Sequence, residues 1–340
     1  MATSDSISSE HAAIRRALTS DVPRIIEFIR QHWRQTHYFV NHPDFFLYHY
    51  ASQDDRLCFY IAEDPGHSIT GILGYLDYAS GEMEHDVILS LWKVKNTSDP
   101  SLGIKMLETL KREIRPRVLA CTGINEKTIP IYKFLRYTTG KMTSYVYPNR
   151  NIDRYKILSG ALPSAPPLIH ADVNVWLRKI DPKELAERYK TLASTARPYK
   201  SVDFIRHRFS RHPVFKYEFW CAEIETASII FVIRRIESQG SAIVRIADIF
   251  GDHALLARLS RAFQKLLDET QAEYLELVQC GVADATLKAG GFVPVDEHAD
   301  LVMPIYFQPF ERRNIDIFYF ASHSEGLRLF LGDGDQDRPN

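Results

Sequence analysis

The residues best suited to bind an anion stand where a strand is followed by a helix. A strand at residues 88–94 leads into a polar stretch at 95–100, and a helix begins at about Ser101. Its first turn would leave backbone N–H groups without partners at the positive end of the helix dipole. The pattern therefore predicts an anion site on this turn. Apolar residues at helical spacing support the helix: Leu102, Met106, Leu107, Leu110 and Ile114.

Acidic side chains precede the same strand. Alternation along a strand puts Glu84 and Asp86 on the face that also carries Trp92, and His85 on the opposite face. A carboxylate there could serve as the general base for an ammonium acceptor. The alternative is a charged strand end with no role in chemistry.

A segment rich in aromatic residues and histidine, residues 32–50, offers another kind of site. Four of the thirteen histidines fall here among seven aromatic residues. One interpretation is a pair of helices packed on the core, with histidines that hydrogen-bond within the fold. The other is an acceptor pocket, in which aromatic faces stack on bases or sugars and histidine donates a hydrogen bond or relays a proton. Candidates for that pocket are His32, Trp33, His37 and Tyr38.

The composition of the 340-residue chain argues against several classes of protein. A net charge of −1 disfavours sequence-independent nucleic-acid binding, which needs a basic face. No apolar run reaches the roughly 18 residues of a membrane span, and the first residues lack the basic and apolar regions of a signal peptide. We therefore expect a cytoplasmic protein with neither a nucleic-acid nor a membrane partner. The oligomeric state is not predicted.

A metal is not expected either. The cysteines occur singly within apolar runs and show no C-x-x-C spacing, which disfavours zinc. The D-x-D-x-D run at residues 333–337 lacks the glycine and glutamate that complete a calcium loop. We interpret the cysteines as reduced core residues: Cys58, Cys121, Cys221 and Cys280.

The loop before the predicted helix resembles one half of a known signature. In the GCN5-related N-acetyltransferase (GNAT) superfamily, this loop reads [Q/R]-x-x-G-x-[G/A] and its N–H groups hold the CoA pyrophosphate. Here Gly103 matches the last glycine, whereas Ser98 replaces Arg or Gln and Ser101 replaces the first glycine.

The other half of the GNAT signature follows one helix and one strand later. The family pattern N-x-x-A-I-x-x-Y-x-x-x-G-F is matched at Asn125, Ile129 and Tyr132, with Tyr137 as the closing aromatic residue, although Thr128 and Arg136 depart from it. The upstream order of a strand at 14–18 and a capped helix from Thr19 to about Trp33 also resembles the start of a GNAT domain. The resemblance implies a mixed α/β fold.

The resemblance implies acyl-CoA as co-substrate and direct attack of a neutral amine on the thioester. Tyr132 would protonate or hydrogen-bond the leaving thiolate; as an alternative, it is a core aromatic residue of its helix. The identity of the general base is left open: it is Asp86, Glu84 or His37, or a chain of water molecules takes its place. The residues implied to bind CoA are Trp92, Val94, Ser101, Leu102, Gly103, Ile104 and Asn125.

After residue 150 the pattern begins again. The run 219–223 repeats 59–63 at an offset of 160 residues, and 277–282 repeats 119–124 at an offset of 158. This internal repeat predicts tandem GNAT-like domains, each a mixed twisted sheet flanked by helices, at residues 1–150 and 173–340 with a linker at 151–172. The second copy has Ala283 where the first has Asn125, no matching tyrosine, and Asp252 beside Gly251. We expect it to bind no CoA and to contribute to the acceptor site.

Three further features resemble a narrower family, the two-domain GNAT sugar N-acyltransferases of bacterial O-antigen and capsule synthesis. They are the H-W-x-x-x-H segment, the L-W-K-V strand and the ending G-D-G-D-Q-D-R-P-N. The resemblance implies transfer of a 3-hydroxybutyryl or acetyl group from CoA to a nucleotide-linked amino sugar such as a dTDP-3-amino-3,6-dideoxyhexose. The tail is expected to dock and to bind the acceptor through Asp333, Asp335 and Arg338.

Two other functions stay open. A FemX-like aminoacyl transferase also uses tandem GNAT domains, but its aminoacyl-tRNA substrate usually needs a basic groove, which the net charge disfavours. A non-catalytic CoA-binding sensor or scaffold would explain Ser98 and Ser101 as signs of lost catalysis.

Overall fold

The computed structural model describes residues 12–52, 54–79, 84–95, 99–163, 175–192 and 196–339. It separates into two compact units, Met1–Asp77 with Leu89–Arg117 and Tyr78–Ile88 with Val118–Asn340. The predicted boundary at residue 150 follows the sequence repeat rather than this division. Residues 164–172 of the predicted linker lie outside the described part of the chain. No helix in that part is long and apolar enough to cross a membrane.

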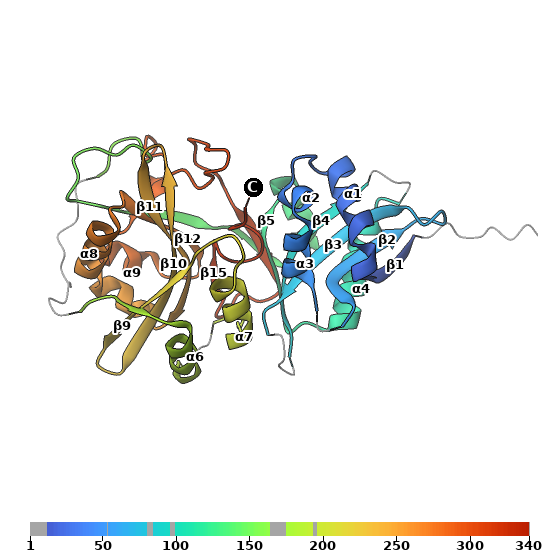
Figure 1. Cartoon of the computed structure of the whole chain (residues 1–340), viewed down its shortest axis with the longest axis horizontal. Helices are drawn as coiled ribbons and strands as arrows, with labels where there is room; N and C mark the ends of the chain where they lie inside the picture. Colours follow the sequence, from blue (N-terminus) through green and yellow to red (C-terminus); the bar gives the residue numbers. More distant parts are fainter. Residues whose placement is uncertain are drawn as a thin grey trace, which may run out of the picture. The chain divides into compact units, whose positions relative to one another are not determined.

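The first unit is built on strands in the order β1-β2-β3-β4 (Figure 1). β2 pairs antiparallel with both β1 and β3, and the predicted strand at 14–18 is confirmed. The elements are β1 (Ala13–Leu18), β2 (Arg56–Glu63), β3 (Ile69–Asp77), β4 (Asp86–Val94, which begins in the second unit), α1 (Val22–His32), α2 (Tyr38–Asn41), α3 (Pro43–Tyr50) and α4 (Leu102–Ile114).

Two glycines on β3 show how helices cover both faces of this sheet. A Cβ atom on Gly71 would lie 2.8 Å from Met106 of α4, whereas one on Gly74 would lie 2.9 Å from Tyr50 of α3. Since the two positions are three residues apart on a strand, they face opposite sides. The sheet therefore has α4 on one face and α3 on the other, and bulkier residues would not fit at these contacts.

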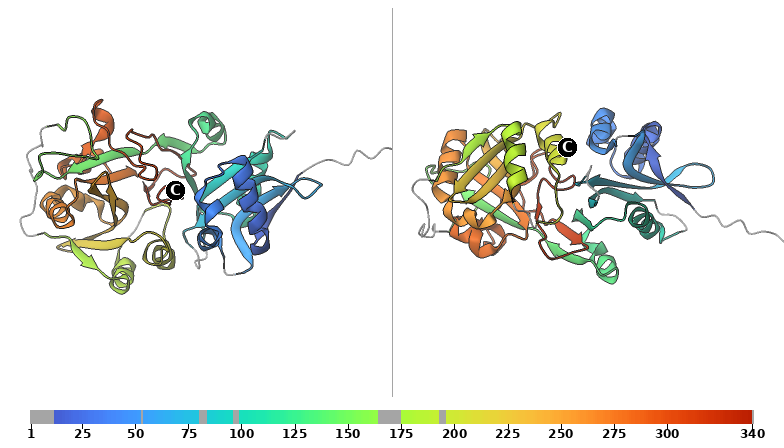
Figure 2. Two further views of the ribbon diagram at one scale, coloured as in Figure 1. Left: turned by 45° about the horizontal axis from the view of Figure 1, so that its top comes forward. Right: turned by 90° about the horizontal axis from the view of Figure 1, so that it is seen from below.

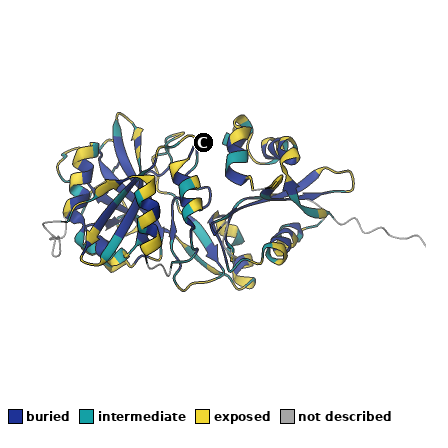
Figure 3. Cartoon of the chain, turned by 60° about the horizontal axis from the view of Figure 1, so that its bottom comes forward, coloured by how far each residue is buried: buried dark blue, intermediate teal, exposed yellow. Residues whose placement is uncertain are grey.

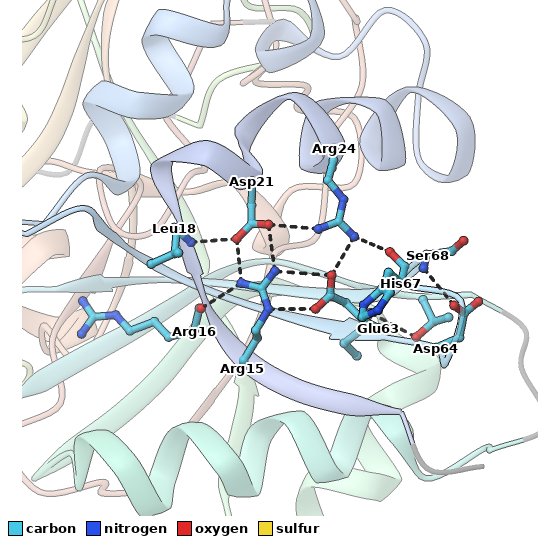
Figure 4. A network of polar contacts seen from close by, with 11 residues as sticks. Arg15, Arg16, Leu18, Asp21, Arg24, Glu63, Asp64, His67 and Ser68 are labelled. Atoms are coloured by element: carbon cyan, nitrogen blue, oxygen red, sulfur yellow. Dashed lines mark hydrogen bonds and ion pairs between the residues drawn. The ribbon is translucent and has the colours of Figure 1, made fainter.

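An ionic network fixes the start of α1 to the sheet (Figure 4). Arg15 of β1 donates to Asp21 at 2.7 Å and to Glu63 of β2 at 2.8 Å, and Arg24 of α1 donates to the same two carboxylates at 3.0 and 2.6 Å. The hydrogen bond from Arg15 lowers the pKa of Asp21. Both carboxylates are buried, so the two arginines satisfy acids that would otherwise be costly to enclose.

The second unit contains a long sheet in the order β13-β7-β12-β11-β10-β9-β8, and three further strands that pair in the order β5-β14-β6. Its helices are α5 (Ile129–Phe134), α6 (Pro182–Thr191), α7 (Val202–Ile205), α8 (Ser260–Thr270) and α9 (Asp284–Ala289). Its strands are β5 (Val118–Ile124), β6 (Thr138–Lys141), β7 (Thr143–Pro148), β8 (Arg178–Ile180), β9 (Glu218–Ile224), β10 (Ala227–Ser238), β11 (Ser241–Gly251), β12 (Tyr274–Cys280), β13 (Val293–Pro294), β14 (Phe318–Ala321) and β15 (Leu329–Phe330).

The strand orders confirm the repeat and show an exchange within it. β8 to β11 follow one another as β1 to β4 do, and β5-β14-β6 corresponds to β12-β7-β13. In each set of three, the middle strand comes from the other repeat: β14 pairs with β5 and β6, and β7 pairs with β12 and β13. Each repeat thus contributes one strand to the other.

Two hydrophobic cores cover the two faces of the long sheet. Along β10, Ile229, Phe231 and Ile233 pack with α8 and α9, whereas the alternating Ile230 and Val232 pack with α6 and α7. Figure 2 shows the helices on both faces, and Figure 3 shows the buried strands between helices with exposed outer surfaces. Burial on both faces explains why β10 reads as a nearly continuous β-branched run rather than an alternating one.

Candidate functional site

In the first unit, the structure bears out the predicted strand, turn and helix. β4 ends at Val94 and α4 begins at Leu102 after the N-cap residue Ser101, whose side chain makes no capping hydrogen bond. Gly103 lies in the first turn, and a Cβ there would reach only ordinary contact, 3.6 Å, with Trp92. The backbone at Gly103 is therefore accessible to a ligand, and the fold itself would tolerate a side chain at this position. Ser98 lies outside the described residues.

Asp99 is a feature of this turn that the sequence argument overlooked. Its carboxylate accepts from the Ser101 backbone N–H at 2.9 Å and from the Ser101 hydroxyl at 2.6 Å, and it pairs with Lys105 at 2.8 Å. These hydrogen bonds lower the pKa of Asp99 to about 2, and the one from Lys105 has the largest effect. Asp252 in the second repeat accepts from the N–H of Ala254 in the same manner. A carboxylate in the loop after the strand therefore does not distinguish the two repeats.

Basic side chains surround the end of β4. The ammonium of Lys95 lies 5.9 Å from the ring of Phe28, and Lys105 projects from the first turn of α4. Partial burial, together with the charges of Lys95 and Lys93, lowers the pKa of His32. Lys93 and Lys95 alternate with Trp92 and Val94, which contact Gly103, so they lie on the α1 face of the sheet. Lys105 is the ammonium that lies at the α4 turn, where it suits a polyanionic ligand. None of these lysines was predicted as a site residue, although the Lys-x-Lys spacing is visible in the sequence.

The aromatic segment of the first unit contains both buried and exposed members. Phe39, Phe45, Phe46 and Tyr50 are buried, which agrees with the core-packing interpretation. Its predicted acceptor residues differ in position. His37 is 3 % exposed, and its Nδ1 accepts a hydrogen bond from the Phe39 N–H, whereas Trp33 is 41 % exposed. The ring of Tyr38 stacks on that of His42 with centroids 4.1 Å apart, and the ring of His32 packs on that of Phe28 with centroids 4.9 Å apart.

In the second unit, Tyr132 is a buried residue of α5. Its ring stacks on Phe320 of β14 with centroids 4.2 Å apart, so the exchanged strand fixes its orientation. Burial raises the pKa of Tyr132, which keeps the phenol protonated at neutral pH. Asn125 is exposed and caps the turn before α5, its side chain accepting from the Lys127 N–H at 3.0 Å. This capping contact is a structural role for Asn125.

The candidate bases differ in exposure. Asp86 is fully buried, and its carboxylate accepts from the backbone N–H of Tyr199 at 2.5 Å. Glu84 is exposed. Both belong to the second unit, whereas His37 belongs to the first. Among the described residues, no group of three or more histidine, cysteine or acidic side chains is arranged to hold a metal ion.

The C-terminal tail docks in the second unit, as predicted. Asp333 and Asp337 are 0 % and 1 % exposed and Asp335 is 9 % exposed. Asp333 pairs with Lys200 at 2.8 Å, and Arg338 pairs with Asp335 at 3.3 Å. These acids are therefore engaged by the protein itself. Lys200 and Arg245, the partners of Asp333 and Asp337, were missed because they lie far away in sequence and carry no local motif.

The chain shares its fold, a tandem of mixed α/β domains, with solved structures described as GCN5-related N-acetyltransferases. No protein-family model and no curated protein sequence matches the chain. Solved structures with this fold include GCN5-related N-acetyltransferases from Anabaena variabilis (9 % identity, 91 % of this chain and 72 % of that chain, TM-score 0.58) and Kribbella flavida (11 %, 93 % and 72 %, 0.53). A glucosamine N-acetyltransferase region of a fungal multi-domain GH3 β-N-acetylglucosaminidase is also similar (10 %, 94 % and 39 %, 0.51).

Proposed function

We propose that the protein is an acyl-CoA-dependent N-acyltransferase. The observation that carries this proposal is the first turn of α4, with the accessible backbone at Gly103 and the ammonium of Lys105 beside it. The positive end of a helix dipole with a nearby ammonium group suits the pyrophosphate of CoA. The fold shared with solved structures described as N-acetyltransferases supports the same assignment.

The proposed CoA contacts follow from that geometry. The residues 101–104 bind the pyrophosphate, and the edge of β4 from Trp92 to Val94 binds the pantetheine arm through its backbone. Lys105 neutralises Asp99 in the free protein, and it turns to the phosphates when they arrive. Because a phosphate carries more charge than the Asp99 carboxylate, the exchange of partners costs little.

We propose an amino sugar as the acceptor, and more narrowly a dTDP-linked 3-amino-3,6-dideoxyhexose receiving an acetyl or 3-hydroxybutyryl group. The exposed Trp33 and the half-buried Tyr38 and His32 offer ring faces on which a sugar or base can stack. A solved structure with the same fold is described as a glucosamine N-acetyltransferase region, which supports a sugar amine as the acceptor. The narrower choice rests on the sequence resemblance.

The reaction we propose is direct transfer. The neutral amine attacks the thioester carbonyl, and the tetrahedral adduct loses a proton to a base. The C–S bond then breaks while the Tyr132 hydroxyl donates a hydrogen bond to the departing thiolate, which takes up the proton that the base holds. Because burial raises the pKa of Tyr132, its hydroxyl keeps its proton and acts as a hydrogen-bond donor. Asp86, Glu84 and His37 are the candidate bases, with a water chain as the alternative.

Thiol release from acetyl-CoA and 3-hydroxybutyryl-CoA, measured with a panel of nucleotide-linked amino sugars, tests the proposal. We expect release only when an amino sugar is present. Tyr132→Phe should lower kcat about 100-fold or more with little change in KM for acyl-CoA. Unchanged kcat would remove Tyr132 from the chemistry, and CoA binding without release on any amine would favour a sensor.

A further inference from the structure

Strands β11 and β12 of the second unit form a fork. They pair in parallel from Val244 with Leu275 to Ile246 with Leu277. β11 continues to Gly251 and β12 to Cys280, so the strands separate beyond the paired segment. β11 holds the place in the second repeat that β4 holds in the first, where we assign the pantetheine arm. Diverging strands present backbone groups that an extended ligand can pair with.

The chain's own residues 329–332 lie in this fork. β15 pairs antiparallel with β12, Phe330 opposite Gln279 and Leu329 opposite Cys280. Two residues later, the Gly332 N–H donates to the carbonyl of Ala247 on β11 at 2.8 Å. One short segment thus bonds to both arms of the fork, and Leu329, Phe330 and Leu331 are no more than 1 % exposed.

Glycines permit this close approach. Gly281, directly after β12, has φ +100°, and a Cβ there would lie 1.9 Å from the carbonyl oxygen of Leu327. A Cβ on Gly332 would lie 2.6 Å from the carbonyl oxygen of Ala247. A side chain at either position would collide with backbone. The sequence is therefore fitted to hold this segment where it is.

A buried lysine locks the segment to β11. The Lys200 ammonium lies 2.5 Å from Asp248 of β11 and 2.8 Å from Asp333, whose other carboxylate oxygen accepts from the Phe330 N–H at 2.7 Å. All three charged side chains are no more than 6 % exposed. Withdrawing the segment would leave Lys200 and Asp248 without Asp333 in a buried setting, which is strongly unfavourable.

The tail beyond the fork is anchored just as firmly. Asp337 accepts from Arg245 at 2.7 Å and from Tyr217 at 2.8 Å, and it also pairs with Arg234. Although burial alone would raise it, the pKa of Asp337 is lowered by these two arginines. Arg208 donates to the carbonyls of residues 332, 334 and 337. Segment release would have to break this whole set.

A cavity of about 70 Å³ lies beside the segment and is lined by Tyr199, Lys200, Asp248, Phe250, His253 and Phe330. The segment closes the fork through its backbone hydrogen bonds to β12 and β11, whatever the size of this cavity.

We propose that residues 329–332 act as a built-in occupant that permanently closes the second repeat to CoA. The inference rests on the proposed function, because it takes CoA to bind the first unit. It assigns the loss of carrier binding in the second repeat to this segment rather than to Asp252, because the loop after β4 in the first repeat also contains a carboxylate, that of Asp99. A full chain then binds one CoA, and the segment does not move during the reaction.

A disulfide lock tests whether the segment must open. Leu329 faces the natural Cys280 across an antiparallel pair, and the Cα spacing of such pairs, about 4.5–5.5 Å, suits a disulfide. We expect the Leu329→Cys chain, oxidised with diamide, to bind one CoA by calorimetry and to keep the turnover of the same protein after reduction, which is the matched control. Loss of binding or turnover on oxidation, restored by reduction, would overturn the proposal, as would two CoA molecules per wild-type chain.

Hydrogen exchange of the wild-type chain separates this inference from the proposed function. We expect the amides of residues 329–332 to exchange as slowly as those of β12, with or without CoA. Faster exchange on addition of CoA, or fast exchange throughout, contradicts a permanent occupant. If no CoA binds at all, the proposed function fails, and slow exchange of the segment still supports the closure of the fork.

Discussion

At Gly103, an added methyl group separates ligand binding from stability. Its Cβ would make only ordinary contacts, 3.6 Å from Trp92 and 3.7 Å from Val94, and alanine favours a helix over glycine by up to about 1 kcal/mol. We expect Gly103→Ala to keep or raise the unfolding temperature and to raise the Kd for CoA, because the methyl group covers the backbone that the pyrophosphate approaches. Calorimetric titration and thermal unfolding measure the two effects.

Gly66→Ala, in a surface turn of the same unit with its nearest contact 3.3 Å away at Asp64, is the control for Gly103→Ala. It should leave the Kd unchanged. Equal affinity of Gly103→Ala and wild type would remove the α4 turn from the CoA site.

His212 makes stability sensitive to mild acid. Its Nδ1 accepts from the N–H groups of Val214 and Phe215 at 3.2 and 2.8 Å, so the ring is held neutral. Burial, with the nearby Arg208, lowers the pKa of His212 to about 3. Between pH 6.5 and 3 the unfolded chain binds the extra proton, so the stability contributed by His212 is present above pH 6.5 and falls by about 1.4 kcal/mol per pH unit below it.

His212→Asn keeps an acceptor for the two N–H groups and removes the titration. Urea unfolding at pH 7 and pH 5 should show the wild type losing about 2 kcal/mol more than this variant between the two pH values. The exposed His323→Asn is the control and should lose as much as the wild type. A His212→Asn chain that loses as much as the wild type would show that the imidazole does not carry the effect.

The limits of the sequence as a guide are visible at single residues. Ser101, Leu102, Gly103 and Ile104 lie on the α4 turn as predicted, since a strand, a polar break and a helical pattern are local signals. The role of Asp86 was left open because its complete burial and its contact with the distant N–H of Tyr199 depend on tertiary structure. Asp99 was overlooked, although its partners Ser101 and Lys105 are local.

At the scale of elements, the contact between β12 and β15 depends on a glycine. Gly281→Ala would force an alanine to φ +100° and against the Leu327 carbonyl, at a cost of about 1–3 kcal/mol. We expect lower stability in urea and faster hydrogen exchange at residues 327–330, with the first unit unaffected. Unchanged exchange in that segment would mean that the backbone can shift without disturbing the fork.

Most elements could be predicted from sequence, but not the strand exchange. The echo between 59–63 and 219–223 showed that a fold is repeated, because repeated strands need the same apolar pattern. That pattern does not specify a partner: β14 is a short strand whose pairing with β5 and β6 spans about 200 residues, and nothing local in Phe318–Ala321 distinguishes that pairing from one with β12. Its register emerges only from tertiary packing.

At the scale of the whole molecule, the exchange predicts that the two repeats cannot fold as independent domains. A chain divided after residue 168 leaves β5 and β6 without β14 in one fragment and β12 and β13 without β7 in the other, so each has unpaired strand edges prone to aggregation. We expect the separately produced fragments to be insoluble or protease-sensitive, and the co-expressed fragments to co-purify through a tag on one of them.

Phe320→Lys, which places a charge at a buried β14 position stacked on Tyr132, should abolish co-purification. Soluble, protease-resistant single fragments would show instead that each repeat closes its own sheet, and the exchanged strands would then add nothing to folding.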